Sequence, residues 1–229
     1  MKYTINQEIE FRKNPYKGTY IALEGIDGCG KTTQAEALKD FFENKGRKVT
    51  ITCEPRVDLT GGEIIMQYFK SEIKISGTAF QYFATANRVI NQEQIVIPAL
   101  KRGDVVITDR CYWSAVPYGL MDKGVKFDRT EADIMLVTQG LLSLYHQFYV
   151  PDYVFYIDIN PNTGLERSLK KKNRRELDFY EKKEKLEKVV KGYRWLVKEF
   201  ANEFITINGE RNISKINDDI IKYLNYAKN

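Results

Sequence analysis

Short runs of apolar residues alternate along this chain with longer stretches of helical periodicity. The apolar runs predict strands at residues 19–25, 48–55, 104–110, 152–159 and 203–209. Helices are predicted at about 32–46, from 63 onward, at 77–103 with a bend before Pro98, at 130–148, at 178–201 and at the C-terminus. Continuously apolar strands separated by helices are typical of a parallel sheet covered on both faces. The pattern therefore predicts an α/β fold.

Polar and glycine-rich segments follow three of the predicted strands, at residues 25–32, 54–56 and 109–118. Parallel sheets of this kind bind ligands beyond the carboxyl ends of their strands. These segments are therefore the first candidates for a binding site.

Composition changes this picture only locally. The length of 229 residues predicts a single domain, which we place at 19–229. Residues 1–18 are polar and end with Pro15 and Gly18, which predicts an N-terminal extension. Residues 166–191 hold 11 Lys or Arg against 6 Asp or Glu, which equals the whole net charge of +5. A charge confined to one segment suits a local anionic ligand, and we expect no nucleic-acid partner.

Other features of the chain concern its location in the cell. There is no apolar run of the length that spans a membrane, and the N-terminus lacks the apolar core of a signal peptide. Three cysteines without paired spacing indicate free thiols in a reducing compartment. We expect a cytoplasmic protein with no membrane partner.

The segment 25–32, GIDGCGKT, matches the phosphate-binding pattern G-x-x-x-x-G-K-[ST] between a predicted strand and a predicted helix. Its glycines let successive backbone N–H groups point at phosphate oxygens. Lys31 can reach the β- and γ-phosphates, and the Thr32 hydroxyl can coordinate Mg²⁺. The pattern predicts ATP and Mg²⁺ as cofactors. The residues expected at the nucleotide are Gly25, Ile26, Asp27, Gly28, Cys29, Gly30, Lys31, Thr32, Thr33 and, from the basic segment, Arg167.

Two further clusters separate kinases from other proteins with this loop. Asp109 is expected to hold the Mg²⁺ shell, and Arg110 can grip a second phosphate, although the two could also form a structural ion pair. On a helix, the basic stretch 167–175 would form one cationic face. We interpret it as a flap over the triphosphate, and a solvated face is the alternative.

Several motifs in order resemble the thymidylate kinase family, P-loop kinases that phosphorylate dTMP to dTDP with ATP. The resemblance runs from about residue 19 to the C-terminus and rests on IALEGIDGCGKTTQ, EP at 54–55, ATANR at 84–88, IPAL..G.VVITDR..WS, PDYVFYIDINP and RRELDFYE followed by KVVKGYRWLVKEF. It implies a P-loop NTPase-type three-layer αβα fold with a five-stranded parallel sheet in the order 2-3-1-4-5. It also implies a helical lid over about 167–180 and a homodimer.

The resemblance implies a role for each matching residue. Asp27 would accept a hydrogen bond from the 3′-hydroxyl of the deoxyribose, and Arg88 would reach the thymine O4. Arg110 would bind the dTMP phosphate, and Tyr118 would press against C2′ of the sugar. The other implied substrate contacts are Glu54, Pro55, Arg56 and Ser114. The expected catalytic residues are Asp27, Lys31, Arg110, Arg174 and Arg175.

The chain departs from the family pattern at four positions. Gly28 stands where one branch has an arginine that reaches the γ-phosphate, so Arg174 or Arg175 is expected to supply that charge. Cys53 replaces the arginine that usually precedes Glu-Pro. Ala84 replaces a phenylalanine that stacks on thymine, and Ala115 replaces a frequent polar base contact. Either another ring, such as Tyr112 or Trp113, covers the base, or the pocket is wider.

Other functions remain open at this point. The chain could be a kinase for another deoxynucleoside monophosphate or for a deoxynucleoside, but Arg110 suits a phosphate acceptor better than a hydroxyl. It could also be a nucleotide-binding regulator without catalysis. The presence of Lys31, Thr32 and Asp109 argues against a regulator.

Overall fold

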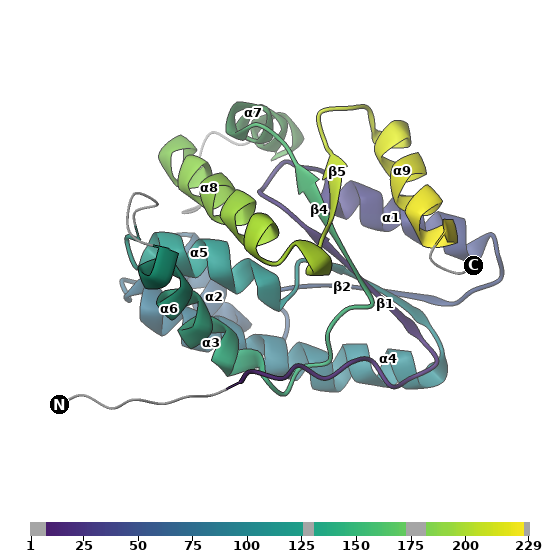
Figure 1. Cartoon of the computed structure of the whole chain (residues 1–229), viewed down its shortest axis with the longest axis horizontal. Coiled ribbons are helices and arrows are strands. Elements are labelled where there is room, and N and C mark those ends of the chain that lie inside the picture. The colour runs from purple at the N-terminus through teal and green to yellow at the C-terminus, as the bar shows by residue number, and fades with distance from the viewer. Residues whose placement is uncertain (1–7, 126–130, 173–181, 227–229) are drawn as a thin grey trace.

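The computed structural model describes residues 8–125, 131–172 and 182–226. One sheet of five parallel strands has the order β2-β3-β1-β4-β5 (Figure 1). The predicted α/β class and the predicted strand order are confirmed. The strands are β1 Thr19–Glu24, β2 Val49–Cys53, β3 Val105–Asp109, β4 Tyr153–Asp158 and β5 Ile205–Asn208.

Helices cover both faces of the sheet. Neighbouring residues of β1 belong to different core clusters, Ala22 to one and Leu23 to the other, because successive side chains point to opposite faces. On the Leu23 side lie α1 Lys31–Glu43 and α9 Ile213–Tyr226. The Ala22 side and its rim carry α2 Gly62–Phe69, α3 Gly77–Asn91, α4 Ile97–Arg102, α5 Ala115–Asp122, α6 Glu131–Leu142, α7 Pro161–Lys172 and α8 Lys183–Glu199.

Two predicted helices differ in detail from the observed ones, and one observed helical segment was not predicted. The expected bend before Pro98 is a π-helical turn, Gln92–Val96, which joins α3 to α4 where the proline lacks an N–H donor. The helix predicted at 130–148 ends at Leu142 and continues as a 3₁₀ turn, Ser143–Tyr145. The segment after β3, for which the sequence indicated no element, forms a 3₁₀ turn at Tyr112–Ser114 and then α5.

The register of the sheet places the candidate residues at one edge. Asp109 at the end of β3 pairs with Leu23 of β1 on one side and with Cys53 of β2 on the other. The segments that follow these three strands therefore start side by side, as the sequence predicted. Within the ranges that the structure describes, no helix combines the length and the apolar character needed to cross a membrane.

Candidate active site

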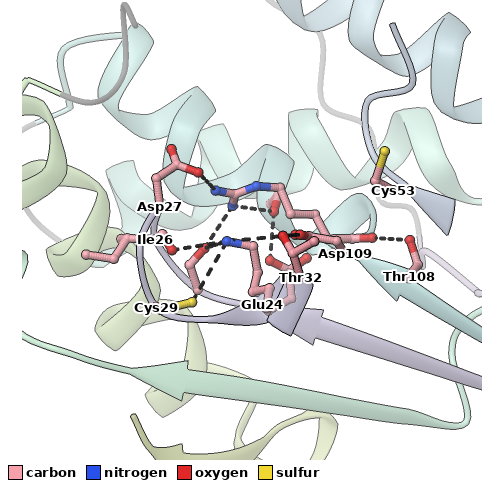
Figure 2. Close-up of polar contacts among 12 residues, drawn as sticks. Glu24, Ile26, Asp27, Cys29, Thr32, Cys53, Thr108 and Asp109 are labelled. Atoms are coloured by element: carbon pink, nitrogen blue, oxygen red, sulfur yellow. Dashed lines mark hydrogen bonds and ion pairs between the residues drawn. The ribbon is translucent and has the colours of Figure 1, made fainter. Parts of the chain in front are cut away.

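The loop between β1 and α1 has the conformation of a phosphate cradle. Gly25, Gly28 and Gly30 have φ angles of 138°, 78° and 104°, in the region that favours glycine. Lys31 Nζ lies at the mouth of the loop, where it donates to the carbonyl oxygens of Gly25 and Ile26 at 3.2 and 3.0 Å (Figure 2). Positive-φ glycines and a lysine ammonium at the N-terminus of a helix are the features of a phosphate-binding loop.

Gly28 leaves no space for a side chain at its position. A Cβ there would lie 2.1 Å from the carbonyl oxygen of Gly164 in α7, and a Cβ on Gly164 would lie 2.7 Å from the Asp27 carbonyl oxygen. The P-loop and α7 therefore approach each other backbone to backbone. The arginine found at this position in one family branch cannot be accommodated here without a backbone shift.

Gly164→Ala should test this close approach. Alanine is favoured over glycine inside a helix by about 1 kcal/mol. The added methyl group, however, has to displace the P-loop by part of an ångström. A misplacement of about 1 Å at a reacting group can cost about 10²-fold in rate. We expect kcat/KM for ATP to fall by roughly 10- to 100-fold, measured by coupled ADP release.

Gly140→Ala in α6 is the matched control, because a Cβ at Gly140 has no atom within 4 Å. This variant should keep full activity. Equal activity of the two variants would show that the Gly28–Gly164 approach is not needed.

Oxygen atoms at the start of α1 and the end of β3 form a candidate Mg²⁺ site. Thr32 Oγ1 donates to Asp109 Oδ2 at 2.7 Å, and Lys31 Nζ lies 3.8 Å from Asp109 Oδ1 (Figure 2). Mg²⁺ in phosphate-binding sites takes one or two protein oxygens together with phosphate oxygens. A hydroxyl and a carboxylate on the cradle fit that requirement.

Arg110 is fixed by contacts from three directions. Nη2 donates to Asp27 Oδ1 at 2.8 Å, and Nη1 donates to the Gly25 carbonyl at 2.9 Å and to the Tyr193 hydroxyl at 3.2 Å. The guanidinium lies over the Tyr118 ring, 5.0 Å from its centre. Burial opposes the charge, but the Tyr118 oxygen and the Asp27 carboxylate outweigh it and raise the pKa of Arg110. Arg110 forms its ion pair with Asp27 of the P-loop, with 2.8 Å between Nη2 and Oδ1.

Arg110 also has an unusual backbone conformation. Its φ is 75°, which is rare for a residue with a side chain. Its N–H donates to the Leu23 carbonyl at 2.9 Å and its own carbonyl accepts from Thr108 Oγ1 at 2.7 Å. Such conformations cost about 1–3 kcal/mol and are found where surrounding contacts enforce them, often at functional sites.

Glu24 and Tyr193 support the site and were not identified from the sequence. Glu24, at the end of β1, is fully buried. Its Oε1 accepts from the Cys111 N–H at 2.8 Å, and its Oε2 accepts from Ser114 Oγ and from the Tyr193 hydroxyl, both at 2.7 Å. The carboxylate thus joins β1, the turn after β3 and α8. The lone acid inside the apolar run 19–25 was the signal for Glu24, whereas nothing local distinguished Tyr193.

A second buried ion pair lies next to the end of β2. Arg88 Nε of α3 lies 3.4 Å from Glu54 Oε2, and Arg88 Nη1 donates to the Tyr145 hydroxyl at 3.0 Å. Glu54 Oε1 accepts from the Asn91 amide at 3.2 Å. Burial raises the pKa of Glu54 to about 7, although Arg88 and Asn91 work against the shift. Glu54 Oε2 and Arg88 Nε face each other as a buried ion pair, whereas the buried Gln81 Oε1 has no hydrogen-bond partner among the described residues.

The raised pKa of Glu54 predicts a pH-dependent stability. The ordinary pKa is 4.5 and the folded value about 7, so the folded protein binds more protons than the unfolded chain between these pH values. The free energy of unfolding should therefore decrease as pH rises from about 5 to about 8, by at most about 3 kcal/mol at about 1.4 kcal/mol per pKa unit.

Urea unfolding at several pH values measures this slope. Glu54→Gln should remove it, because glutamine does not titrate. Glu199→Gln, at an exposed position of α8, is the control and should retain it. If the free energy of unfolding has the same pH dependence in the wild type and in both variants, titratable groups other than Glu54 cause it.

A cavity of about 670 Å³ brings most of the predicted residues together. It extends from the P-loop to the end of β2 on one side and to the start of α9 on the other. Its walls include the predicted Asp27, Gly28, Cys29, Gly30, Lys31, Thr32, Thr33, Glu54, Asp109, Arg110 and Arg167. They also include Ser168, Arg211, Asn212, Ile213 and Ile216, which the sequence did not single out.

Other predicted residues lie beside this cavity or outside the described residues. Ser114 and Tyr118 contact Arg110, and Pro55 follows Glu54 through a cis peptide bond. The Arg56 guanidinium pairs with Asp58, and its backbone is held by the Asn87 amide. The predicted lid arginines, Arg174 and Arg175, lie outside the described residues.

The rings proposed as a substitute for the missing phenylalanine are packed elsewhere. Tyr112 and Trp113 are buried, and Tyr112 stacks on Phe11 with ring centres 5.1 Å apart. Trp113 packs against Phe200 and Phe204. Neither ring lines the cavity. Ala84 and Ala115 are themselves buried in the core, and the wider pocket stays a prediction.

A P-loop that follows the central strand of a parallel sheet, with an arginine at the end of the adjacent strand, defines a P-loop protein of the nucleotide-kinase class. The family model described as "Thymidylate kinase" matches residues 23–220. This chain belongs to the thymidylate kinase family.

Thymidylate kinases from three organisms are similar to most of this chain. The chain is 31% identical over 214 residues to that of Thermoanaerobacter sp. (strain X514), covering 91% of this chain and 100% of the relative. It is 31% identical over 217 residues to that of Caldanaerobacter subterraneus subsp. tengcongensis, covering 93% and 99%. It is 31% identical over 214 residues to that of Plasmodium falciparum (isolate 3D7), covering 93% and 92%.

Proposed function

We propose that this protein transfers a phosphoryl group from ATP to dTMP to form dTDP. The observation that carries the proposal is Arg110, whose guanidinium is held beside the P-loop by Asp27 and Tyr193. A planar guanidinium fits a phosphate by two parallel hydrogen bonds. A second phosphate bound there would face the phosphate held by Lys31, which is the arrangement that phosphoryl transfer between two nucleotides requires.

On the donor side, the P-loop N–H groups and Lys31 would bind the ATP phosphates. Mg²⁺ would be held by Thr32 and Asp109, and it would neutralise negative charge on the phosphates when bound. Arg167, whose Nη1 donates to the Gly209 carbonyl at 2.9 Å, would face the nucleoside part of ATP across the cavity. We propose that the lid over about 167–180 brings Arg174 or Arg175 to the transferring group.

On the acceptor side, Arg110 would bind the dTMP phosphate and Asp27 would accept from the 3′-hydroxyl. The acceptor phosphate is ionised near neutral pH, so no strong general base is required. Arg88 would donate to the thymine O4, and its buried guanidinium is held for that contact by Glu54 and by the Tyr145 hydroxyl. The residues proposed to complete the pocket are Pro55, Arg56, Ser114 and Tyr118.

We further propose that residues 19–229 act as one kinase domain, in a cytoplasmic homodimer. The three cysteines, Cys29, Cys53 and Cys111, are free thiols, which supports a reducing compartment. Tyr82 and Phe83 of α3 and Leu136 of α6 are exposed large hydrophobic residues, which is typical of helices that pack against a partner. Light scattering coupled to size-exclusion chromatography should give twice the chain mass of 26.7 kDa.

A panel of acceptors offered with Mg-ATP tests the function directly. dTMP, dUMP, dCMP, dGMP, dAMP and thymidine are compared by ADP release and by identification of the product. We expect dTMP to be the best acceptor and thymidine to be inert. Because Ala84 stands where the family resemblance implies a phenylalanine stacked on thymine, we expect weak discrimination between bases, and dUMP should be the next best. A preference for another nucleotide or for thymidine would overturn the assignment, and ADP release from none of them would favour a regulator.

Tyr118→Ala should narrow the preference for deoxyribose. The Tyr118 ring lies against the Arg110 guanidinium, and at this place it would leave no space for a 2′-hydroxyl. We expect the ratio of kcat/KM for dTMP to that for its ribose counterpart to fall by about tenfold, which corresponds to about 1.4 kcal/mol. Tyr118→Phe keeps the ring and should keep the ratio. An unchanged ratio in Tyr118→Ala would show that Tyr118 does not line the sugar pocket.

A further inference from the structure

An N-terminal segment, residues 8–18, packs onto the molecule outside the range 23–220 that matches the family model. In Figure 1 its dark purple trace runs along the edge of the molecule toward α4. Arg12 forms a parallel bridge with Tyr149, in which its N–H donates to the Phe148 carbonyl at 3.2 Å and its carbonyl accepts from the Val150 N–H at 2.9 Å. The segment is thus attached to the connection between α6 and β4.

Aromatic packing fastens the same segment to the interior. The Phe11 ring stacks on Tyr112, with centres 5.1 Å apart and planes 22° apart. Tyr112 in turn packs against Tyr145 at 5.8 Å and against Phe148 at 6.4 Å. Phe11 therefore closes one end of an aromatic cluster that has Tyr145 at its other end.

The hydroxyl of Tyr145 belongs to a chain of hydrogen bonds with a defined direction. Thr85 Oγ1 donates its proton to the Gln81 carbonyl at 2.7 Å, so the Tyr145 hydroxyl donates to Thr85 Oγ1 at 2.8 Å. The Tyr145 oxygen is then the acceptor for Arg88 Nη1 at 3.0 Å. Since Tyr145 is fully buried, its position determines where this side of the Arg88 guanidinium points.

A second contact ties the same connection to the helix that carries Arg88. The Gln92 amide, one turn beyond Arg88, donates to the Tyr149 carbonyl at 3.1 Å and accepts from the Tyr149 N–H at 2.8 Å. The stretch 145–150 therefore lies between the Arg88 helix on one side and the N-terminal segment on the other. Removing the outer segment leaves that stretch held from one side only.

We propose that the N-terminal segment is a positioning element for recognition of the nucleotide base. It holds Tyr145 through Phe11 and through the Arg12 bridge, and Tyr145 fixes the Arg88 guanidinium. The inference rests on the proposed function, in which Arg88 faces the base of dTMP. It assigns the segment to the acceptor base and leaves the ATP site independent of it.

Steady-state kinetics and calorimetric titration of the full chain test the proposal with Phe11→Ala and Tyr145→Phe. Each should raise the KM and the Kd for dTMP by about five- to tenfold, as expected for weakening one hydrogen bond of a charged group. KM for ATP and kcat should change by less than about twofold. The KM and Kd for dTMP in the double variant should be no higher than in Tyr145→Phe. Both changes weaken the same contact, the one between Tyr145 and Arg88. Lys13→Ala, at an exposed position of the same segment, should match the wild type.

The outcomes separate the inference from the function on which it rests. A wild type that does not phosphorylate dTMP would overturn the proposed function. An active wild type with an unchanged dTMP affinity in Phe11→Ala, even with a lower Tm, would reduce the segment to a stabilising role and overturn the inference. Multiplying losses in the double variant would also contradict it, because Phe11 and Tyr145 would then act independently.

Discussion

Arg110→Gln should lower kcat/KM for dTMP by about 10²–10⁴-fold. Glutamine removes the charge and two hydrogen bonds to a phosphate, each worth about 1.5–3 kcal/mol when one partner is charged. It also leaves the Asp27 carboxylate without the guanidinium that it now contacts at 2.8 Å. KM for ATP should change far less, because the P-loop and Lys31 bind that nucleotide. Initial rates at varied dTMP and at varied ATP measure the two effects separately.

Two variants bracket this result. Tyr193→Phe keeps the ring and removes the hydroxyl that accepts from Arg110 Nη1 and donates to Glu24 Oε2. It should raise KM for dTMP by about tenfold, as expected for one weakened charged hydrogen bond. Arg102→Gln changes a half-exposed arginine that pairs with Asp104, far from the cavity, and should leave the kinetics unchanged. An unaltered KM for dTMP in Arg110→Gln would show that this arginine does not bind the acceptor.

Alanine substitution of one of the two lid arginines, Arg174 or Arg175, should lower kcat by at least about a hundredfold. An arginine that meets the transferring phosphoryl group is worth about 10³–10⁵ in rate. The structure supports a supply from outside the P-loop, because a Cβ at Gly28 would lie 2.1 Å from the Gly164 carbonyl oxygen. KM for dTMP should change only modestly, since the charge acts on the transferring group.

Single-turnover measurements with each arginine variant separate the chemical step from product release. Lys198→Ala, which removes an exposed charge on α8, is the control for a general loss of positive charge. Small and equal losses of kcat in both arginine variants would show that the basic stretch is a solvated face without a catalytic role. In that case the charge at the transferring group would have to come from a residue that the lid does not contain.

Local signals explain why most of the fold could be predicted. The inner strands β1 and β3 are short apolar runs because both of their faces are covered, so their burial is encoded within their own residues. The P-loop was equally visible, since its glycines are needed at fixed spacing by the backbone conformation itself. The strand order, by contrast, was inferred through the family resemblance, because the sequence of a strand does not indicate which strand lies beside it.

The site was predicted in part, and three of the residues that were missed share one property. Glu24, Tyr193 and Tyr145 act through partners more than fifty residues away in the chain. Their types are ordinary for buried strands and helices, so their local pattern indicates packing alone. Arg56, by contrast, pairs with its close neighbour Asp58, and its role at the substrate stays a prediction.

The sequence by itself determined the α/β class, the phosphate-binding loop and the arginine at the end of the third strand. These features follow from periodicity and from backbone requirements within a few residues. Only the tertiary structure decided how Arg110 and Arg88 are aimed, why position 28 excludes a side chain, and where the N-terminal segment is attached. Those features depend on distances between atoms of remote segments, and such distances exist only once the core has brought the segments together.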